Sequence, residues 1–121
     1  MLRKVFGYRY SEPPPRLVVF FGPTQIAELT TEGSQFVFQY LPGFKTVNLS
    51  PLPGFTDVTK VYRSPRLWPF FQERIPDPRR PEIRDLMRRE GLAGASELEL
   101  LARLGARTIT DPFEFRLVKA A

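Results

Sequence analysis

Prolines constrain this chain more than any other residue type, because a proline fixes φ and donates no backbone hydrogen bond. The 121 residues contain 13 prolines, most of them between stretches with a clear hydrophobic period. We therefore expect a compact fold of short elements joined by well-defined loops. The run PPP at residues 13–15 favours an extended conformation and marks a boundary. It predicts an extended arm over residues 1–15 and a single domain over residues 16–121.

The first part of the domain has the pattern of an antiparallel meander. Arg16 to Phe21 is a β-branched and aromatic run that ends at a Gly-Pro turn, and Gln25 to Thr30 forms the returning strand. Gln35 to Tyr40 alternates, with its aromatic residues on one side. Three consecutive strands are predicted.

Turns dominate the middle of the domain. Pro42-Gly43 and Pro53-Gly54 are strong turn signals, and Val58 to Tyr62 is predicted as another short strand. Pro51 and Pro53 exclude a central strand between the two turns, since each removes a donor from the ladder.

Three short helices are predicted after residue 64. Ser64-Pro65 and Asp77-Pro78 each resemble an N-cap followed by a proline at the first helical position. Ser96 begins a capping box, and Gly91 and Gly105 stand where the second and third helices would stop. The three apolar faces consist of Leu67, Phe70 and Phe71, then Ile83, Leu86 and Met87, then Leu100, Leu101 and Leu104.

A last strand is predicted from Phe113 to Val118, where apolar and polar residues alternate again. A terminal strand needs an edge to pair with, so we place it back in the sheet. The predicted class is α+β: a small antiparallel sheet, made of the meander plus the C-terminal strand and either open or closed into a barrel, with about three short helices.

Several kinds of chemistry lack the residues they need. Cysteine and histidine are both absent, which excludes disulfides, thiolate metal sites and the commonest general base. No glycine-rich phosphate loop is visible, and no apolar run reaches the length of a signal-peptide core or of a membrane span. We expect a cytoplasmic protein with no catalytic residue, no cofactor, no metal and no small-molecule substrate.

Trp68 is the single tryptophan and lies in a cluster of prolines and phenylalanines. The sequence leaves open whether it packs in the core or stands exposed as the anchor of an interface, because it falls outside the stripe of Leu67 and its helical neighbours. The predicted contact loop consists of Arg66, Trp68, Pro69 and Phe71.

Arginines are dense between residues 63 and 89, where four acidic residues interrupt the series and Glu90 follows it. The favoured interpretation is a solvated helix face on which acids and arginines pair. The alternative is a patch for phosphate or for an acidic partner, consistent with the net charge of +5. Arg80, Arg84 and Arg88 repeat at i, i+4 and i+8, so they share a face and form a second candidate contact.

Five segments, in order, resemble the N-terminal domain of HipA-type toxin kinases. They are LVVFFGPTQIAELT, QFVFQY, VNLSPLPGF, LWPFFQERIPD and LELLARLGARTITDPFEFRLV, and together they cover about residues 16–118. Each motif is weak alone, but five in the same order and spacing are moderately specific. Ile109 to Pro112 depart from the family's Gly-Ala-Val stretch. The kinase's catalytic Asp, metal-binding Asp and nucleotide lysine have no matching positions.

The resemblance implies the fold of the HipA N-terminal subdomain and a HipS-like role. In three-gene HipBST systems such a domain is a separate polypeptide that binds a shortened HipT kinase and restrains it. By that resemblance the chain would be an antitoxin-like protein that inhibits a HipT-type Ser/Thr kinase. A HipB-like helix-turn-helix repressor would belong to the same complex, and contact with DNA would be indirect or weak.

Two other hypotheses remain open at this point. The chain could be a DNA-associated accessory protein that assists a helix-turn-helix repressor through its basic face. That hypothesis rests only on the net positive charge of the chain, and it predicts DNA binding that falls steeply with salt. The chain could also be a purely structural domain, for which the sequence offers no test.

Overall fold

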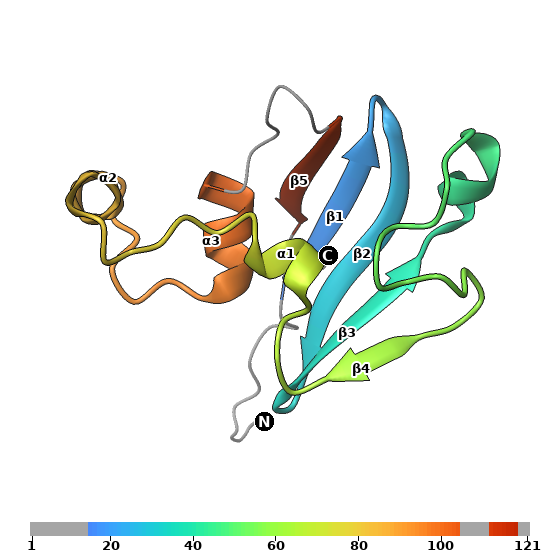
Figure 1. Cartoon of the computed structure of the whole chain (residues 1–121), viewed down its shortest axis with the longest axis horizontal. Coiled ribbons are helices and arrows are strands. Elements are labelled where there is room, and N and C mark those ends of the chain that lie inside the picture. The colour runs from blue at the N-terminus through green and yellow to red at the C-terminus, as the bar shows by residue number, and fades with distance from the viewer. Residues whose placement is uncertain (1–14, 105–111, 119–121) are drawn as a thin grey trace, which may run out of the picture.

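A five-stranded antiparallel sheet forms the centre of the protein in the computed structural model, which describes residues 15–104 and 112–118 (Figure 1). The strands are β1 (Arg16–Phe21), β2 (Thr24–Glu32), β3 (Gln35–Tyr40), β4 (Tyr62–Ser64) and β5 (Phe113–Val118). Their order is β4-β3-β2-β1-β5, so β4 and β5 are the two edges and the sheet is open. The α+β class is confirmed, and the alternative of a closed barrel is wrong.

The predicted meander and the return of the last strand are both confirmed. β1, β2 and β3 pair consecutively, and a bulge between Val19 and Phe20 shifts the register of β1 on β2. β5 pairs with β1 along its whole length, with Val19 opposite Phe115. β5 therefore forms the edge opposite β4, and the first and last strands of the domain lie side by side in one sheet.

The middle of the chain differs from its prediction. The short strand is Tyr62–Ser64 rather than Val58 to Tyr62, because Asp57 fixes a turn just before it. The Asp57 carboxylate accepts hydrogen bonds from the backbone N–H of Thr59 at 3.0 Å and from its hydroxyl at 2.7 Å. Such an Asx turn offers the backbone an alternative to the ladder.

The Pro42-Gly43 turn is the start of a short 3₁₀ helix, η1 (Pro42–Thr46). η1 lies so close to β2 that a Cβ on Gly43 would stand 2.3 Å from the carbonyl oxygen of Gln25. Only glycine permits this approach of two backbones.

The helices are α1 (Pro69–Gln72), α2 (Pro81–Arg89) and α3 (Glu97–Leu104). α1 begins four residues after Pro65, and α2 begins three residues after Pro78. The predicted N-caps, Ser64 and Asp77, are therefore wrong. In each case a second proline, Pro69 or Pro81, occupies the start of the helix instead, and no side chain caps it.

The two misassigned cap residues form local turns. The Ser64 hydroxyl accepts the Arg66 N–H at 3.1 Å, and the Asp77 carboxylate accepts the Arg79 N–H at 2.9 Å. Serine and aspartate make such turns as readily as helix caps. Sequence alone therefore did not distinguish the first Pro of each pair from the second.

The capping box of α3 is confirmed. The Glu99 N–H donates to the Ser96 hydroxyl at 3.2 Å, and the Ser96 N–H donates to the Glu99 carboxylate at 3.1 Å. Gly91 follows α2 with a φ of +70°, as expected for a C-terminal stop. Gly105 and residues 1–14 of the predicted arm lie outside the described residues.

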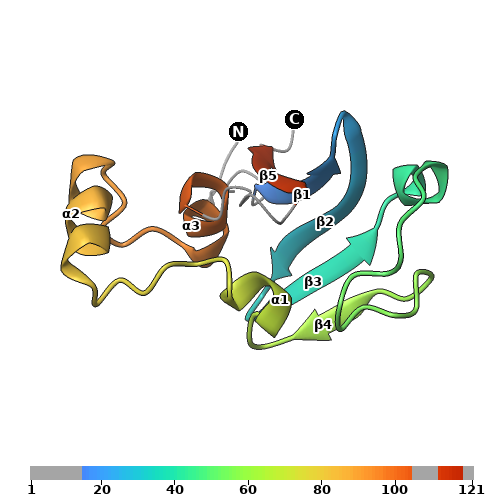
Figure 2. The same ribbon diagram turned by 45° about the horizontal axis from the view of Figure 1, so that its top comes forward.

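One face of the sheet carries the core, to which α1, α3 and the loop over residues 47–61 contribute (Figures 1 and 2). Its members are Leu17, Val19, Ile26, Ala27, Leu29, Phe38, Phe44, Leu52, Phe55, Leu67, Phe70, Phe71, Leu98, Leu101 and Phe115. The predicted burial of Leu67, Phe70 and Phe71 is confirmed. Phe38 is the central aromatic residue, and Phe55 from the loop stacks on its ring with centroids 3.9 Å apart.

The other two predicted helix faces are confirmed only in part. α3 buries Leu98 and Leu101, whereas Leu100 and Leu104 are half-buried. α2 buries none of its residues: Ile83, Leu86 and Met87 form the predicted apolar stripe, but each is only half-buried.

Tyr40 fastens the loop to the sheet. Its hydroxyl accepts the Leu52 N–H at 2.8 Å and donates to the Phe55 carbonyl at 2.7 Å. Burial raises the pKa of the Tyr40 phenol above its usual value. The protonated phenol is therefore the form that the folded protein favours.

Replacing Tyr40 with Phe should lower the free energy of unfolding by about 1–3 kcal/mol, because it leaves a loop N–H and a carbonyl without their partner. Urea denaturation at pH 7 measures the change. Tyr62→Phe is the matched control, since the Tyr62 hydroxyl accepts only the exposed Asp57 N–H at 2.9 Å and donates weakly to the Asp57 carbonyl at 3.4 Å.

The pH dependence gives an independent check of the same interaction. Because folding raises the Tyr40 pKa, its contribution is complete below the ordinary tyrosine pKa of about 10 and is lost as pH rises through the folded pKa. Wild type should therefore lose more stability than Tyr40→Phe between pH 9 and 11. Equal losses would contradict the assigned role.

Candidate protein-binding surface

Trp68 lies immediately before α1 and is half-buried. The inner part of its ring packs edge-on against Phe55, with centroids 5.2 Å apart, and against Phe38 at 6.5 Å. Trp68 is therefore neither fully buried nor fully exposed, and its role as an interface anchor stays a prediction. The indole is fixed by the core on one side and accessible on the other.

The accessible part of Trp68 borders a hollow of about 440 Å³. We call its lining the Trp68 surface: Pro53, Gly54, Trp68, Pro69, Phe70, Glu73 and Arg74. Two segments far apart in sequence meet here, the Pro-Gly turn of the loop and the start of α1. Sequence reasoning found Pro53-Gly54 as a turn but missed its place beside Trp68, because only the Phe55 contact with the core brings the two together.

A cation stands at the edge of this hollow. The Arg74 guanidinium lies over the Phe70 ring, 4.0 Å from its centroid, and donates to the Phe70 carbonyl at 2.6 Å. Burial lowers the pKa of Arg74, and the charge of neighbouring Glu73 opposes that shift. An arginine stays protonated in proteins, so the hollow combines an apolar wall with a fixed positive charge. Such a site suits an apolar side chain with a polar group beside it.

The other members of the predicted contact loop divide into two groups. Arg66 and Pro69 are exposed and lie beside Trp68 in the chain. Phe71 is 0% exposed and packs among Phe38 and Phe55. Its predicted place in a contact surface is therefore not supported, because a residue at i+3 from Trp68 on this short helix points into the core.

The second predicted contact, Arg80, Arg84 and Arg88, lies on exposed positions of α2 and its N-cap, at the end of the molecule away from β4 (Figures 1 and 2). Arg80 pairs with Glu82 at 3.2 Å, and Arg88 pairs with Asp85 at 3.0 Å. The favoured interpretation, a face of paired charges, holds for these two. Within the described residues, the one hydrogen bond of the Arg84 guanidinium is to the Arg79 carbonyl, at 3.4 Å.

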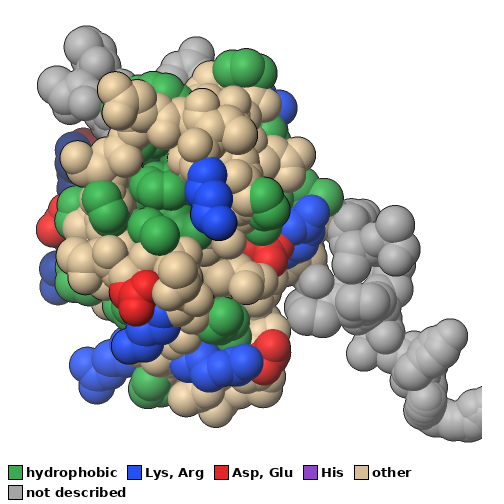
Figure 3. All heavy atoms as spheres, turned by 90° about the vertical axis from the view of Figure 1, so that its right-hand side faces the viewer, with side chains coloured by type: hydrophobic (Ala, Val, Ile, Leu, Met, Phe, Trp, Pro, Cys, Tyr) green, Lys and Arg blue, Asp and Glu red, His purple; other side chains and the backbone are tan. Residues whose placement is uncertain are grey.

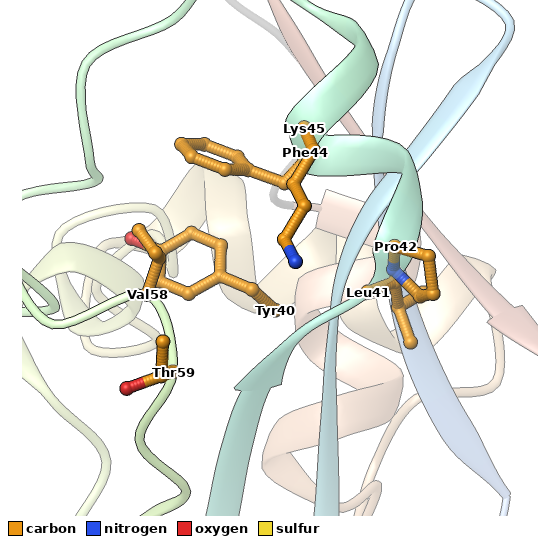
Figure 4. A pocket seen from close by; sticks show the side chains of 7 residues that line it. All are labelled: Tyr40, Leu41, Pro42, Phe44, Lys45, Val58 and Thr59. Carbon is orange, nitrogen blue, oxygen red and sulfur yellow. The ribbon is translucent and has the colours of Figure 1, made fainter.

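A smaller hollow of about 290 Å³ opens where β3 meets η1, on the face that Figure 3 shows with hydrophobic side chains gathered near its middle. It is lined by Tyr40, Leu41, Pro42, Phe44, Lys45, Val58 and Thr59 (Figure 4). In that view the Lys45 amine extends over the space between Tyr40 and Pro42. Sequence reasoning missed this hollow, since no motif marks it and it depends on the tight packing of Gly43.

Among residues 15–104 and 112–118, no three acidic side chains gather as a metal site would require. The helices in the same part of the chain include none that is long and apolar enough to cross a membrane.

Substitutions of Trp68 and of the nearby Arg66 should show which of the two side chains packs against the core. Trp68→Ala removes the edge contacts with Phe38 and Phe55 and should cost roughly 1–3 kcal/mol, less than for a fully buried aromatic residue. Arg66→Ala touches no core residue and should change stability by less than about 0.5 kcal/mol. Urea denaturation followed by circular dichroism measures both, and equal costs would contradict the half-buried placement of Trp68.

Comparison with protein families gives one match. The model described as the HipA N-terminal domain matches residues 17–109, from the second residue of β1 past the end of α3. No curated protein matches the chain in sequence.

Proposed function

The chain belongs to the HipA N-terminal domain family, and from this premise we propose that it is an antitoxin-like protein that binds a HipT-type serine/threonine kinase and inhibits it. Family membership gives a role related to toxin–antitoxin systems. The matched family is the N-terminal domain of HipA and not its kinase domain. An effect on a kinase would therefore come from contact between two proteins.

The observation that carries the proposal is the Trp68 surface. A half-buried tryptophan held on one side by Phe38 and Phe55 loses little rotational freedom when a partner covers its other side. Tryptophan and arginine are also the residues that most often dominate binding energy at interfaces. The adjoining hollow, with Arg74 at its edge, offers a partner both an apolar cavity and a charge.

The complex in this proposal also includes a HipB-like helix-turn-helix repressor, with any DNA contact made indirectly. The alternative of a DNA-associated accessory protein depends on Arg80, Arg84 and Arg88 as a free basic face. Two of these three arginines are already paired with carboxylates. Since paired arginines release fewer counterions from DNA, the structure gives that alternative less support.

The first test is co-purification of the chain with a HipT-type kinase, followed by autophosphorylation of the kinase with and without the chain. We expect a stable complex and suppressed phosphorylation. A complex with unchanged phosphorylation would limit the role to scaffolding. No complex, together with a salt-dependent shift of operator DNA, would support the accessory hypothesis instead.

Trp68→Ala should weaken the complex by about 2 kcal/mol or more, which is about 30-fold in affinity. Because Trp68 is the only tryptophan, 5-fluorotryptophan labelling gives the chain a single ¹⁹F resonance that reports this surface directly. Unlabelled kinase should shift or broaden that resonance.

Val61→Ala provides the matched control. Val61 is a 43% exposed apolar residue outside the Trp68 surface, and its truncation should leave the affinity unchanged. Unchanged affinity for a folded Trp68→Ala variant would contradict the assignment of the surface.

A further inference from the structure

α2 differs from α1 and α3 in that it buries none of its own residues. It is held at its two ends. Before it, hydrogen bonds from the Arg79 side chain and N–H fix Asp77 and lower the pKa of that carboxyl. After it, Glu90 pairs with Arg103 of α3, and the buried Leu92 donates its N–H to the Met87 carbonyl at 2.7 Å. The helix is thus positioned without being packed into the core.

The apolar residues of α2 form an incompletely covered stripe. Ile83, Leu86 and Met87 stand at i, i+3 and i+4, the spacing of one helix face, and each is only half-buried. α3 packs on β5 and β1, whereas α2 makes no comparable contact with a strand or another helix. Figures 1 and 2 both show it set apart from the sheet. In the described part of the chain, no strand or other helix packs on this stripe as α3 packs on β5 and β1, and its three residues remain partly exposed.

Positive charge borders the stripe on both sides. Arg84 lies three residues before Met87, and Arg89 lies three residues after Leu86, so each neighbours the stripe from an opposite side. Among residues 15–104 and 112–118, no carboxylate lies within ion-pair distance of either guanidinium. These two arginines are the charges that α2 leaves uncompensated.

We propose that α2 is a second docking element, which lays Ile83, Leu86 and Met87 into an apolar groove of the kinase whose two rims carry carboxylates. An amphipathic helix in an apolar groove is a recurring recognition mode. Carboxylates at the rims complement Arg84 and Arg89, which set the register of the helix and speed association. This inference rests on the proposed function, because it names the kinase as the partner.

Charge argues against two other occupants. A second copy of the chain would bring the same unpaired arginines and the same net charge of +5 against the stripe. Nucleic acid would gain from Arg84 and Arg89 but would leave Ile83, Leu86 and Met87 without a partner. Only a protein surface that is both apolar and acidic matches the whole face.

The experiment measures affinity for a purified HipT-type kinase by titration calorimetry at 50 and 300 mM salt. Arg84→Gln with Arg89→Gln should weaken binding about tenfold at low salt and reduce the salt dependence. Arg80→Gln with Arg88→Gln changes the net charge equally, but at positions already paired within α2, and should weaken binding much less. Leu86→Gln should weaken binding about tenfold at both salt concentrations.

All of these substitutions lie on residues that are exposed or half-buried, so thermal unfolding should show folded proteins. Equal losses for the two arginine pairs would overturn the inference, because they would reduce the effect to long-range attraction. Wild-type affinity for all the α2 variants would overturn it and leave the proposed function standing. Absence of wild-type binding would overturn both. Self-association or DNA binding abolished by Leu86→Gln or by the Arg84/Arg89 pair would assign the face to a different occupant and would also overturn it.

Discussion

The stacking of Phe55 on Phe38 is the contact on which most of the remaining architecture depends. It brings a loop that contains Pro51 and Pro53 onto a sheet face where Phe71 of α1 also packs against Phe38. Tyr40 holds that loop from the same strand by two hydrogen bonds. Trp68 then packs against both stacked rings. The position of the half-buried indole is therefore set largely by a contact between β3 and a loop.

The sequence predicted the structure best in segments where one local pattern specified the backbone geometry and no second pattern nearby favoured another. The alternation in β3 and β5 and the reciprocal capping box at Ser96 each specify one backbone geometry, and each is confirmed. It was least informative where two signals of equal strength lay a few residues apart. Pro65 and Pro69 each fit the first turn of a helix, and only the burial of Phe70 and Phe71 favours the later start. The apolar pattern predicted which residues are buried, but the exact backbone position that buries them is a tertiary effect that the local sequence does not specify.

The two candidate surfaces differ in how much of each can be predicted from the sequence. Trp68 is visible as a rare residue type, but its hollow exists only because Pro53 and Gly54 arrive from the loop. The arginines of α2 are visible as a repeat, yet the repeat does not separate paired from unpaired members. Arg88 has Asp85 three residues away, whereas Arg89, its neighbour in sequence, has no such partner among the described residues. Pairing depends on side-chain geometry, which composition and spacing do not report.

The short edge strand β4 has a consequence for how the protein behaves at high concentration. It covers only Phe36 to Phe38 of β3, and its central residue, Arg63, pairs with Glu32 across the end of the sheet. A strand from another molecule could pair with only three residues of β4, and the middle one of these is charged. Natural proteins use short, charged edges of this kind to prevent edge-to-edge polymerisation. An edge of this kind gives another molecule little on which to extend the sheet at β4.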